Sequence, residues 1–290
     1  MENSYVDLHV HTKYSDGAFT PEEAVRYAKK VGLTAISITD HDTTEGLPEA
    51  IKAGSELDIE VIPGVELSVA VQTSIEQEIH ILGYFINWED SFFQKKLKIF
   101  QKAREQRANQ ILEKLKKLGI IVDEKKLSEI VGVGVFGRLH FAKVLVETQV
   151  AKNINEVFNK YLGYGKPAYV PKLRLTPDEA IKMIISVGGV PILAHPHCND
   201  ITQNTIESLV KQGLKGIEVW HIKHTNSETE KLKKIAEKFE IISTGGSDCH
   251  GVMIKGMPAI MGTVKVSYEI VTELKKCRDN IDKVNTQLFA

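Results

Sequence analysis

The stretch YVDLHVHTKYSDG, residues 5–17, continues an apolar strand pattern with two histidines and an aspartate. Successive side chains of a strand point to opposite faces of its sheet, so His9 and His11 share one face. Two imidazoles at this spacing can bind one metal ion, whereas a single histidine at a strand end is commonly a hydrogen-bonding residue. The Ser-Asp-Gly sequence around Asp16 predicts a tight turn. The rest of the chain has to decide between a metal site and a structural role.

Short apolar runs and amphipathic helical patterns alternate over the first 86 residues. Thr20 is expected to cap a helix that begins at Pro21 and stops at Gly32. A second helix is expected at 46–57, and further strands at residues 34–40, 60–69 and 79–86. Strands and helices in this alternation predict parallel strands joined by crossover helices.

The pattern changes near Trp88. Residues 91–118 read as one long, charged amphipathic helix, and shorter helical segments follow it without strands. The alternation resumes near Pro177, so the chain holds about seven strand-helix units split by one insert. This α/β pattern favours a distorted (β/α)7 barrel over an open doubly wound sheet. We expect residues 1–87 and 176–290 to form the barrel and residues 88–175 to form a helical insertion domain that covers the active site.

A glycine-rich stretch, GVGVFG at 132–137, has the wrong spacing for a dinucleotide-binding fingerprint and is expected to be a turn between helices of the insert. The chain has 290 residues, and its 37 basic side chains nearly balance 38 acidic ones. This balance gives no electrostatic case for a membrane-surface protein or for a partner of long duplex nucleic acid. No basic segment with an apolar run opens the chain, so a cytoplasmic protein is expected. The three cysteines, without CxxC spacing, predict packing roles rather than disulfides.

Histidines and carboxylates gather at the ends of the expected strands. Seven of the ten histidines in the chain lie at such positions. The residues concerned are His9, His11, Asp16, His41, Glu66, His80, His195, His197, Asp248 and His250. The carboxyl ends of barrel strands meet at one face, where such barrels assemble their sites. Imidazoles and carboxylates together suit Mn²⁺, Fe²⁺ or Zn²⁺, so the pattern predicts a multinuclear metal site.

The segments DLHVHTKYSDG, ITDHD, GVELS, IHILGY, AHP and GSDCHG, in this order, resemble the PHP family of phosphoesterases, named for polymerase and histidinol phosphatase. They cover residues 7–251. The resemblance implies a distorted seven-stranded barrel with three divalent ions at its mouth. His9, His11, Glu66 and Asp248 would hold one ion; Glu66 would bridge to a second ion on His80 and His195; and Asp16, His41 and His250 would hold the third.

The insert resembles that of one branch of this family. Members of that branch remove phosphate from adenosine monophosphate, from nucleoside 3',5'-bisphosphates or from the ends of short oligoribonucleotides. GRLHFAKVL matches an element that faces the metals there, which makes Arg138 and His140 candidate substrate-binding and catalytic residues. GKPAYVPK places Lys166 and Lys172 where other members often have arginine. Lysine keeps the charge but loses the bidentate geometry of arginine.

The expected activity is hydrolysis of nucleotide phosphate monoesters by a hydroxide that bridges two ions beside Glu66. His197 or His140 could protonate the leaving oxygen, with an orienting role as the alternative for His197. Arg138 could bind a phosphate or form a surface ion pair. Asp7, Asp40 and Asp42 are expected to orient imidazoles, and His221 and His224 to lie in a loop or at the substrate rim.

Other readings remain open. They are a histidinol-phosphate phosphatase, a non-catalytic PHP module and a metal-dependent C–N hydrolase. The sequence does not determine the oligomeric state.

Overall fold

The computed structural model describes residues 4–71, 77–196, 201–251 and 259–288. Its strands form a single sheet of eight members in the order β7-β6-β5-β4-β3-β2-β1-β8. The strands are β1 (Tyr5–Val10), β2 (Leu33–Ile38), β3 (Glu60–Val71), β4 (Gln77–Tyr84), β5 (Val190–Leu193), β6 (Gly216–His221), β7 (Ile242–Gly246) and β8 (Val266–Ser267). Val10, at the end of β1, pairs with Cys249 just beyond β7, so the sheet curves into a nearly closed barrel. The predicted α/β barrel is confirmed.

Strand direction differs from the expectation at β4. The strands β1, β2 and β3 are parallel to one another, as are β5, β6 and β7. The strand β4 runs antiparallel to both of its neighbours, β3 and β5. Only residues 72–76 separate β3 from β4, too few for a crossover connection, which needs about a dozen residues. The short β8 is also antiparallel to its partner β1.

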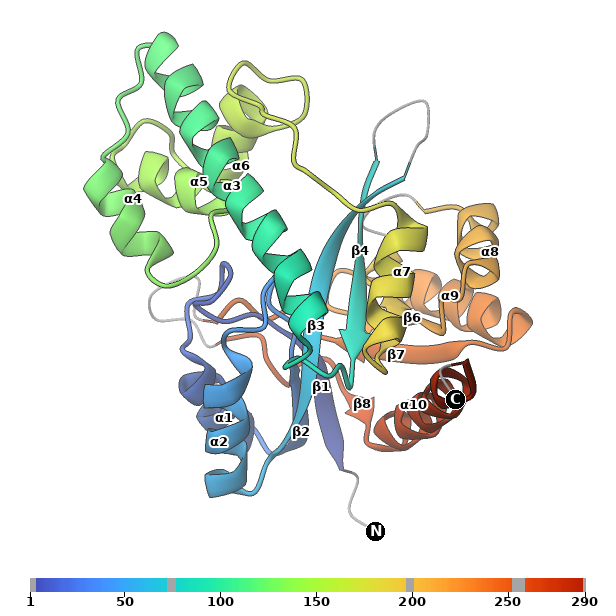
Figure 1. Ribbon diagram of the computed structural model, residues 1–290. Helices are drawn as coiled ribbons and strands as arrows, with labels where there is room; N and C mark the ends of the chain where they lie inside the picture. Colours follow the sequence, from blue (N-terminus) through green and yellow to red (C-terminus); the bar gives the residue numbers. More distant parts are fainter. Residues whose placement is uncertain (1–3, 72–76, 197–200, 252–258, 289–290) are drawn as a thin grey trace.

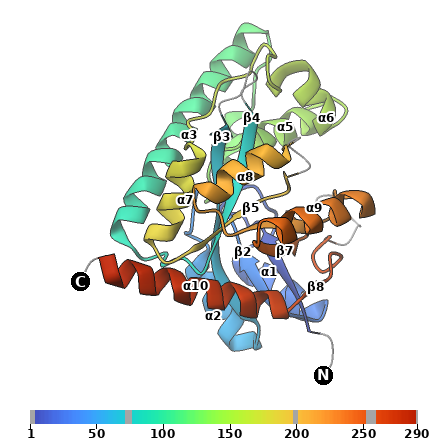
Figure 2. The same cartoon turned by 90° about the vertical axis from the view of Figure 1, so that its right-hand side faces the viewer.

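Helices cover the barrel on the outside (Figure 1). They are α1 (Pro21–Lys30), α2 (Leu47–Leu57), α7 (Pro177–Ser186), α8 (Gln203–Lys211), α9 (Asn226–Lys238) and α10 (Glu269–Leu288). The predicted start of α1 is confirmed, because the Thr20 side chain accepts a hydrogen bond from the Glu23 amide and Pro21 is the first helical residue. Buried side chains of β1, β3 and β4 pack in one cluster with α10, which lies across the end of the barrel nearest the N-terminus (Figure 2).

The middle of the chain is helical, as predicted. It consists of α3 (Ser91–Lys117), α4 (Glu124–Val131), α5 (Arg138–Glu147), α6 (Ile154–Val157) and the π-helix η1 (Phe158–Leu162). The first part of α3 packs on the barrel through Phe93 and Leu97, and its later part packs in a separate cluster with α4 and α5 through Ile111 and Leu115. The GVGVFG stretch is the turn between α4 and α5, as expected.

These helices rest on the loop that follows β1. The Val135 amide donates to the Tyr14 carbonyl at 3.2 Å, and the Lys143 ammonium donates to the Asp16 carbonyl at 3.2 Å. Among the described residues, no helix is both long and apolar enough to span a membrane. Cys249 is buried and Cys277 packs beside the α10 cluster, whereas Cys198 lies outside the described residues.

Candidate metal centre

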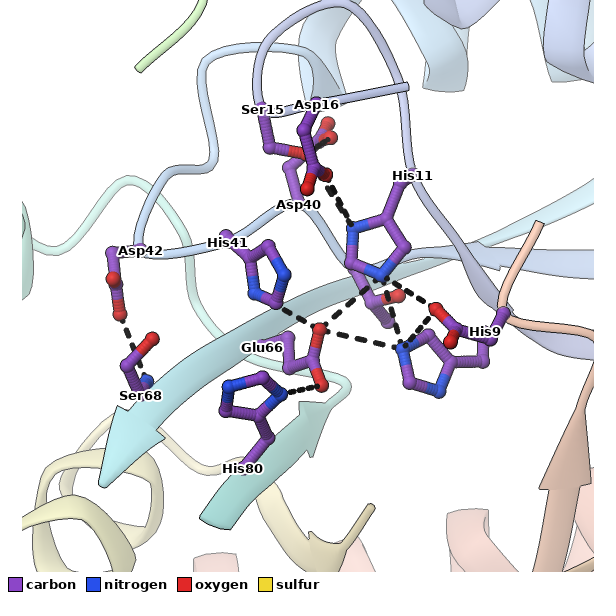
Figure 3. A network of polar contacts seen from close by, with 12 residues as sticks. His9, His11, Ser15, Asp16, Asp40, His41, Asp42, Glu66, Ser68 and His80 are labelled. Carbon is purple, nitrogen blue, oxygen red and sulfur yellow. Dashed lines mark hydrogen bonds and ion pairs between the residues drawn. The ribbon is translucent and has the colours of Figure 1, made fainter. Parts of the chain in front are cut away.

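The end of β1 fixes the first two imidazoles. The His11 amide donates to the Cys249 carbonyl at 2.9 Å, and the Cys249 amide donates to the His9 carbonyl at 3.2 Å. These bonds hold both histidines in strand geometry, so their rings share one face as predicted. Their Nε2 atoms face each other at 3.1 Å (Figure 3).

Two carboxylates complete a group of four around this point. Glu66 Oε2 lies 3.4 Å from His9 Nε2 and 3.2 Å from His11 Nε2. Asp248 Oδ1 lies 3.6 Å and 3.3 Å from the same two nitrogens. A tetrahedral ion with ligand distances near 2.0–2.1 Å separates its ligands by about 3.4 Å, so the ligand atoms of His9, His11 and Glu66 have the spacing of ligands around one ion, and Asp248 approaches the same two histidines.

The second oxygen of Glu66 faces different histidines. Glu66 Oε1 lies 2.8 Å from His80 Nδ1 and 3.1 Å from His195 Nε2. His41 Nδ1 approaches the other oxygen, Oε2, at 3.0 Å. The carboxylate of Glu66 therefore joins two groups of imidazoles, one through each oxygen, from the centre of β3 (Figure 3).

Asp16 brings a third group together. Its Oδ1 atom lies 3.2 Å from His250 Nε2, and ligand atoms of His11, Asp16, His41 and His250 all lie within 4.8 Å of one another. The turn depends on Gly17, because a Cβ there would lie 2.5 Å from the His11 carbonyl oxygen. The predicted tight turn thus directs the Asp16 carboxylate back toward the histidines.

The buried nitrogen and oxygen atoms of the cluster are arranged to bind a cation rather than to form hydrogen bonds with one another. His9, His11 and Glu66 are fully buried. Five buried atoms in the cluster make no hydrogen bond of normal geometry with a described residue, even where an imidazole or carboxylate lies within 3.4 Å: Asp16 Oδ1, His41 Nδ1, Glu66 Oε2, His80 Nδ1 and His195 Nδ1. Nitrogen and carboxylate donors left in this way are those that Zn²⁺, Mn²⁺ or Fe²⁺ take up. The residues therefore fit a divalent metal site.

The electrostatics of the cluster agree with this fit. Burial alone would raise the pKa of Glu66, but His41, His80 and His9 hold it well below its usual value. Burial opposes the charged form of His11, yet its hydrogen bonds to Asp248 and Glu66 raise its pKa to about 10. The pKa values of His9 and His80 are raised as well, whereas burial lowers the pKa of His41 to about 4. In the chain alone, protons on His9, His11 and His80 thus balance the carboxylates, and a bound cation would replace them.

Glu218, on β6, is the site residue that the sequence analysis missed. Its Oε1 lies 3.0 Å from His9 Nδ1, and its Oε2 accepts from the His195 amide at 2.7 Å. It is fully buried. A glutamate inside an apolar strand is the one sequence signal that could have marked it.

Three aspartates bind other partners than the imidazoles expected for them. Asp7 accepts from the Ser247 and Gly262 amides at 2.9 and 3.2 Å. Asp40 accepts from Thr12 and Ser15 in the loop after β1, and Asp42 accepts from Ser68 and Arg104. Asp7 and Asp42 thus hold backbone segments and a guanidinium, and the expectation that they orient imidazole rings was wrong. Asp40 reaches an imidazole through Ser15, whose Oγ lies 3.4 Å from His11 Nδ1.

His221 also differs from its expected position. It is the last residue of β6, is only 5% exposed, and its Nε2 lies 3.6 Å from Asp248 Oδ2. It belongs to the interior of the site rather than to a loop or a rim. The sequence pattern predicts a strand that ends at Trp220, whereas the strand continues through His221.

The predicted substrate residues lie in different surroundings. Arg138 begins α5 and stacks near the rings of Phe158 and Tyr169. Lys172 is buried, with its ammonium 3.5 Å from Asp42 Oδ2, and burial with the nearby Arg104 lowers its pKa to about 8. Lys166 is exposed, and its backbone forms a turn after η1.

His140 is 2% exposed, and its Nδ1 accepts from the Gly137 amide at 3.2 Å. Burial lowers its pKa to about 4. His197 lies outside the described residues.

Comparisons with known proteins place this geometry in context. The sequence profile of the family described as PHP domain matches residues 7–162. Over 250 residues the chain is 32% identical to the 3',5'-nucleoside bisphosphate phosphatase of Chromobacterium violaceum, covering 84% of this chain and 87% of that protein. It is 34% identical over 250 residues to the 5'-3' exoribonuclease Rnm of Escherichia coli, covering 84% of each.

Two solved structures resemble the fold closely. One is described as a metal-dependent phosphoesterase from Bifidobacterium adolescentis, with a TM-score of 0.85, 29% identity and coverage of 95% of this chain and 96% of that one. The other is described as an amidohydrolase from Chromobacterium violaceum with bound sulfate, with a TM-score of 0.79, 31% identity and coverage of 84% and 87%.

Proposed function

The chain belongs to the PHP domain family and is a metal-dependent phosphoesterase, and from this premise we propose that it hydrolyses phosphate monoesters of nucleotides. Its substrates would be adenosine monophosphate, nucleoside 3',5'-bisphosphates and the 5' ends of short oligoribonucleotides. The names of its relatives, a nucleoside bisphosphate phosphatase and an exoribonuclease, support this substrate class over histidinol phosphate.

The observation that carries the proposal is the position of Glu66 between two groups of imidazoles. A carboxylate that joins two ion sites is typical of two-metal phosphoester hydrolysis. Divalent ions held there would lower the pKa of a water molecule and polarise the phosphate. Glu66 would fix the spacing of the two sites, and Glu218 would fix the tautomer of His9.

We propose the same three ligand sets that the family resemblance implies. His9, His11, Glu66 and Asp248 would hold one ion, and Glu66, His80 and His195 a second. Asp16, His41 and His250 would hold a third. The contacts of Asp248 with His9 and His11, of Glu66 with His80 and His195, and of Asp16 with His250 support these sets. Mn²⁺, Zn²⁺ or Fe²⁺ would suit these donors.

The substrate would be bound by cationic groups of the insert. We propose Arg138 and Lys172 as phosphate-binding residues, with the exposed Lys166 at the entrance. His197 and His140 stay the two candidates for protonating the leaving oxygen. Burial lowers the pKa of His140 to about 4, its Nδ1 accepts from the Gly137 amide and its ring also hydrogen-bonds the Ser15 backbone, so His140 is poorly suited to the role of the acid.

We further propose that residues 88–175 form an insertion domain covering the site, on a barrel of residues 1–87 and 176–290. The separate hydrophobic cluster of α4 and α5 and the contacts of the insert with the loop after β1 support this division. The cytoplasmic location stays a prediction.

The test measures initial rates of phosphate release with added Mn²⁺. The substrates are adenosine monophosphate, adenosine 3',5'-bisphosphate, a 5'-phosphorylated oligoribonucleotide and histidinol phosphate. We expect rapid, chelator-sensitive release from the nucleotides. Asp248→Ala should lower the rate by at least about a hundredfold, because even indirect partners of metal ligands contribute roughly 10- to 100-fold. Asp178→Ala, which removes an exposed carboxylate paired with Lys182 on α7, is the matched control.

Preference for histidinol phosphate would overturn the nucleotide assignment. Absence of release from all four substrates would favour the non-catalytic module. Because one related structure is described as an amidohydrolase, the same samples are also assayed with an N-acetylated amino acid. Cleavage of that amide without phosphate release would favour the C–N hydrolase.

A further inference from the structure

Five cationic side chains gather beside the metal ligands, where the insert meets β3 and β4. This cation cluster consists of Arg104 and Arg107 of α3, Arg138 of α5, and Lys172 and Arg174 of the segment before α7. Arg104 and Arg107 are each 6% exposed, and the side chains of Lys172 and Arg174 are 8% and 4% exposed. Buried cations in this number are costly unless anions balance them.

Asp42 balances one member of the cation cluster. Arg104 donates to Asp42 Oδ2 through Nε at 3.0 Å and through Nη2 at 2.5 Å. The pKa of Asp42 is accordingly held below its usual value, since Arg104 and Lys172 outweigh the effect of burial. This pair anchors α3 to the loop after β2. Asp42 also lies 3.5 Å from Lys172 Nζ, but its single negative charge offsets only one of the five cations.

Glu78 is the second carboxylate that contacts the cation cluster. Its Oε2 lies 3.0 Å from Arg174 Nη2 and 3.5 Å from Arg138 Nη2. Its Oε1 lies 3.6 Å from Lys172 Nζ and 3.5 Å from His80 Nε2. On β4, two residues before His80, Glu78 thus stands between the cation cluster and the proposed metal ligands.

One carboxylate does not satisfy these cations. Arg107 donates through Nε to the Val170 carbonyl at 2.9 Å, but its buried Nη2 has no hydrogen-bond partner among the described residues. Its electrostatic neighbours include Arg138 and Arg104 as well as Glu78, and burial with these like charges lowers its pKa to about 10. A buried guanidinium nitrogen without an acceptor, among other cations, indicates a place for an additional anion.

We propose that the cation cluster binds a second anionic group of the substrate. In the free enzyme, the Glu78 carboxylate occupies the position that this group would take. A second phosphate would displace the Glu78 carboxylate from Arg138 and Arg174 and accept from Arg107 Nη2. Glu78 is then a specificity-determining residue: it disfavours stray anions and sets how strongly a substrate with two phosphates is preferred over one with a single phosphate. This inference rests on the proposed function, because it concerns binding next to the same metal ligands.

A different role for Glu78 has a different signature. Its contact with His80 could simply orient that imidazole, as carboxylates often do for histidine ligands of metals. In that case Glu78→Gln would weaken metal binding and lower kcat on every phosphate ester alike. Displacement by a second phosphate instead affects the KM of the bisphosphate.

The experiment compares kcat and KM for adenosine 3',5'-bisphosphate and adenosine monophosphate at saturating Mn²⁺. For Glu78→Gln we expect the bisphosphate-to-monophosphate ratio of kcat/KM to rise about tenfold, through a lower KM for the bisphosphate. Arg107→Met should lower this ratio by a similar factor. If Arg107→Met does not fold, Arg107→Lys is tested instead, because it keeps the charge but loses the bidentate geometry of the guanidinium. Glu207→Gln, which breaks an exposed pair with Lys211 on α8, is the matched control.

A second measurement does not depend on catalysis. Calorimetric titration of the chelator-treated protein with adenosine 3',5'-bisphosphate should show binding about tenfold tighter in Glu78→Gln and weaker in the Arg107 variant. An unchanged ratio and unchanged affinity, or a loss of metal affinity with an equal drop on both substrates, would overturn the inference. If the unmodified enzyme released phosphate from neither nucleotide, the proposed function would fail, and the calorimetric comparison would still decide whether Glu78 blocks an anion site.

Discussion

At the scale of single residues, Glu66 and Glu218 position different histidines of the site. Glu66 faces imidazoles with both oxygens, three of them within 3.1 Å, from the middle of β3. Glu218 lies behind His9, contacts its Nδ1, and also holds the backbone of His195, whose φ of 27° is left-handed. Such a backbone conformation is costly for a residue other than glycine and persists only where its surroundings hold it. Glu218 therefore orients one ring and fixes the position of another.

Glu218→Gln should weaken metal binding by roughly 10- to 100-fold, because the amide keeps the shape but removes the charge that makes His9 a better ligand. Competition titrations with a chelator, with bound metal counted by mass spectrometry, measure this change. The matched control is Glu60→Gln, since Glu60 is a partly buried strand glutamate that pairs with Lys275 at 2.7 Å. Unchanged metal affinity in Glu218→Gln would show that the His9 contact does not tune the site.

At the scale of elements, the loop after β1 is the meeting point of barrel and insert. It carries Asp16, and the turn between α4 and α5 rests on its backbone. Gly134 in that turn has no space for a side chain, since a Cβ there would lie 2.9 Å from the Ser15 carbonyl oxygen. The position of the Asp16 carboxylate thus depends on a glycine more than a hundred residues away.

Gly134→Ala should push the insert turn away from this loop and destabilise the protein by about 1–3 kcal/mol, as overpacking usually does. We also expect a lower kcat/KM, because Asp16 loses its support. Gly137→Ala is the control in the same turn, where the nearest atom to an added Cβ is His140 Nδ1 at 3.9 Å. Thermal unfolding and steady-state rates of both variants test the idea, and equal behaviour of the two would refute it.

At the scale of the whole molecule, α3 connects two hydrophobic clusters. Phe93 and Leu97 lie in the barrel cluster, and Ile111 and Leu115 lie in the cluster of the insert. The helix passes the metal ligands between these ends, where Arg104 binds Asp42. Barrel, insert and metal site therefore share one continuous element, so binding at the site should stabilise the whole protein rather than one part.

Added Mn²⁺ should raise the unfolding temperature in a single transition. At a free concentration 100 times the Kd, the stabilisation is about 2.7 kcal/mol for one site. Scanning calorimetry of chelator-treated and reloaded protein measures it, and Asp248→Ala should reduce the shift. Two separate transitions, with only one moved by the metal, would contradict the shared role of α3.

Local sequence determined much of this protein. The cap and proline that begin α1, the long helix from residue 91 and the shared face of His9 and His11 depend on contacts within a few residues, where backbone preferences and strand alternation decide. The nine proposed ligands were also visible in the sequence on or just after the expected strands, although Glu66 and His80 lie within β3 and β4 rather than at their ends. The barrel followed from the alternation of strands and helices.

Only the tertiary structure decided which of these residues meet. The direction of β4, the two separate partners of the Glu66 oxygens, the contact of Glu218 with His9 and the place of Glu78 among buried cations join residues far apart in the chain. Such contacts depend on how strands and helices pack, and a strand pattern has the same alternation whichever strand lies beside it. The sequence alone therefore determined which metal-binding and charged side chains are present, and packing decided which of them lie close enough to act together.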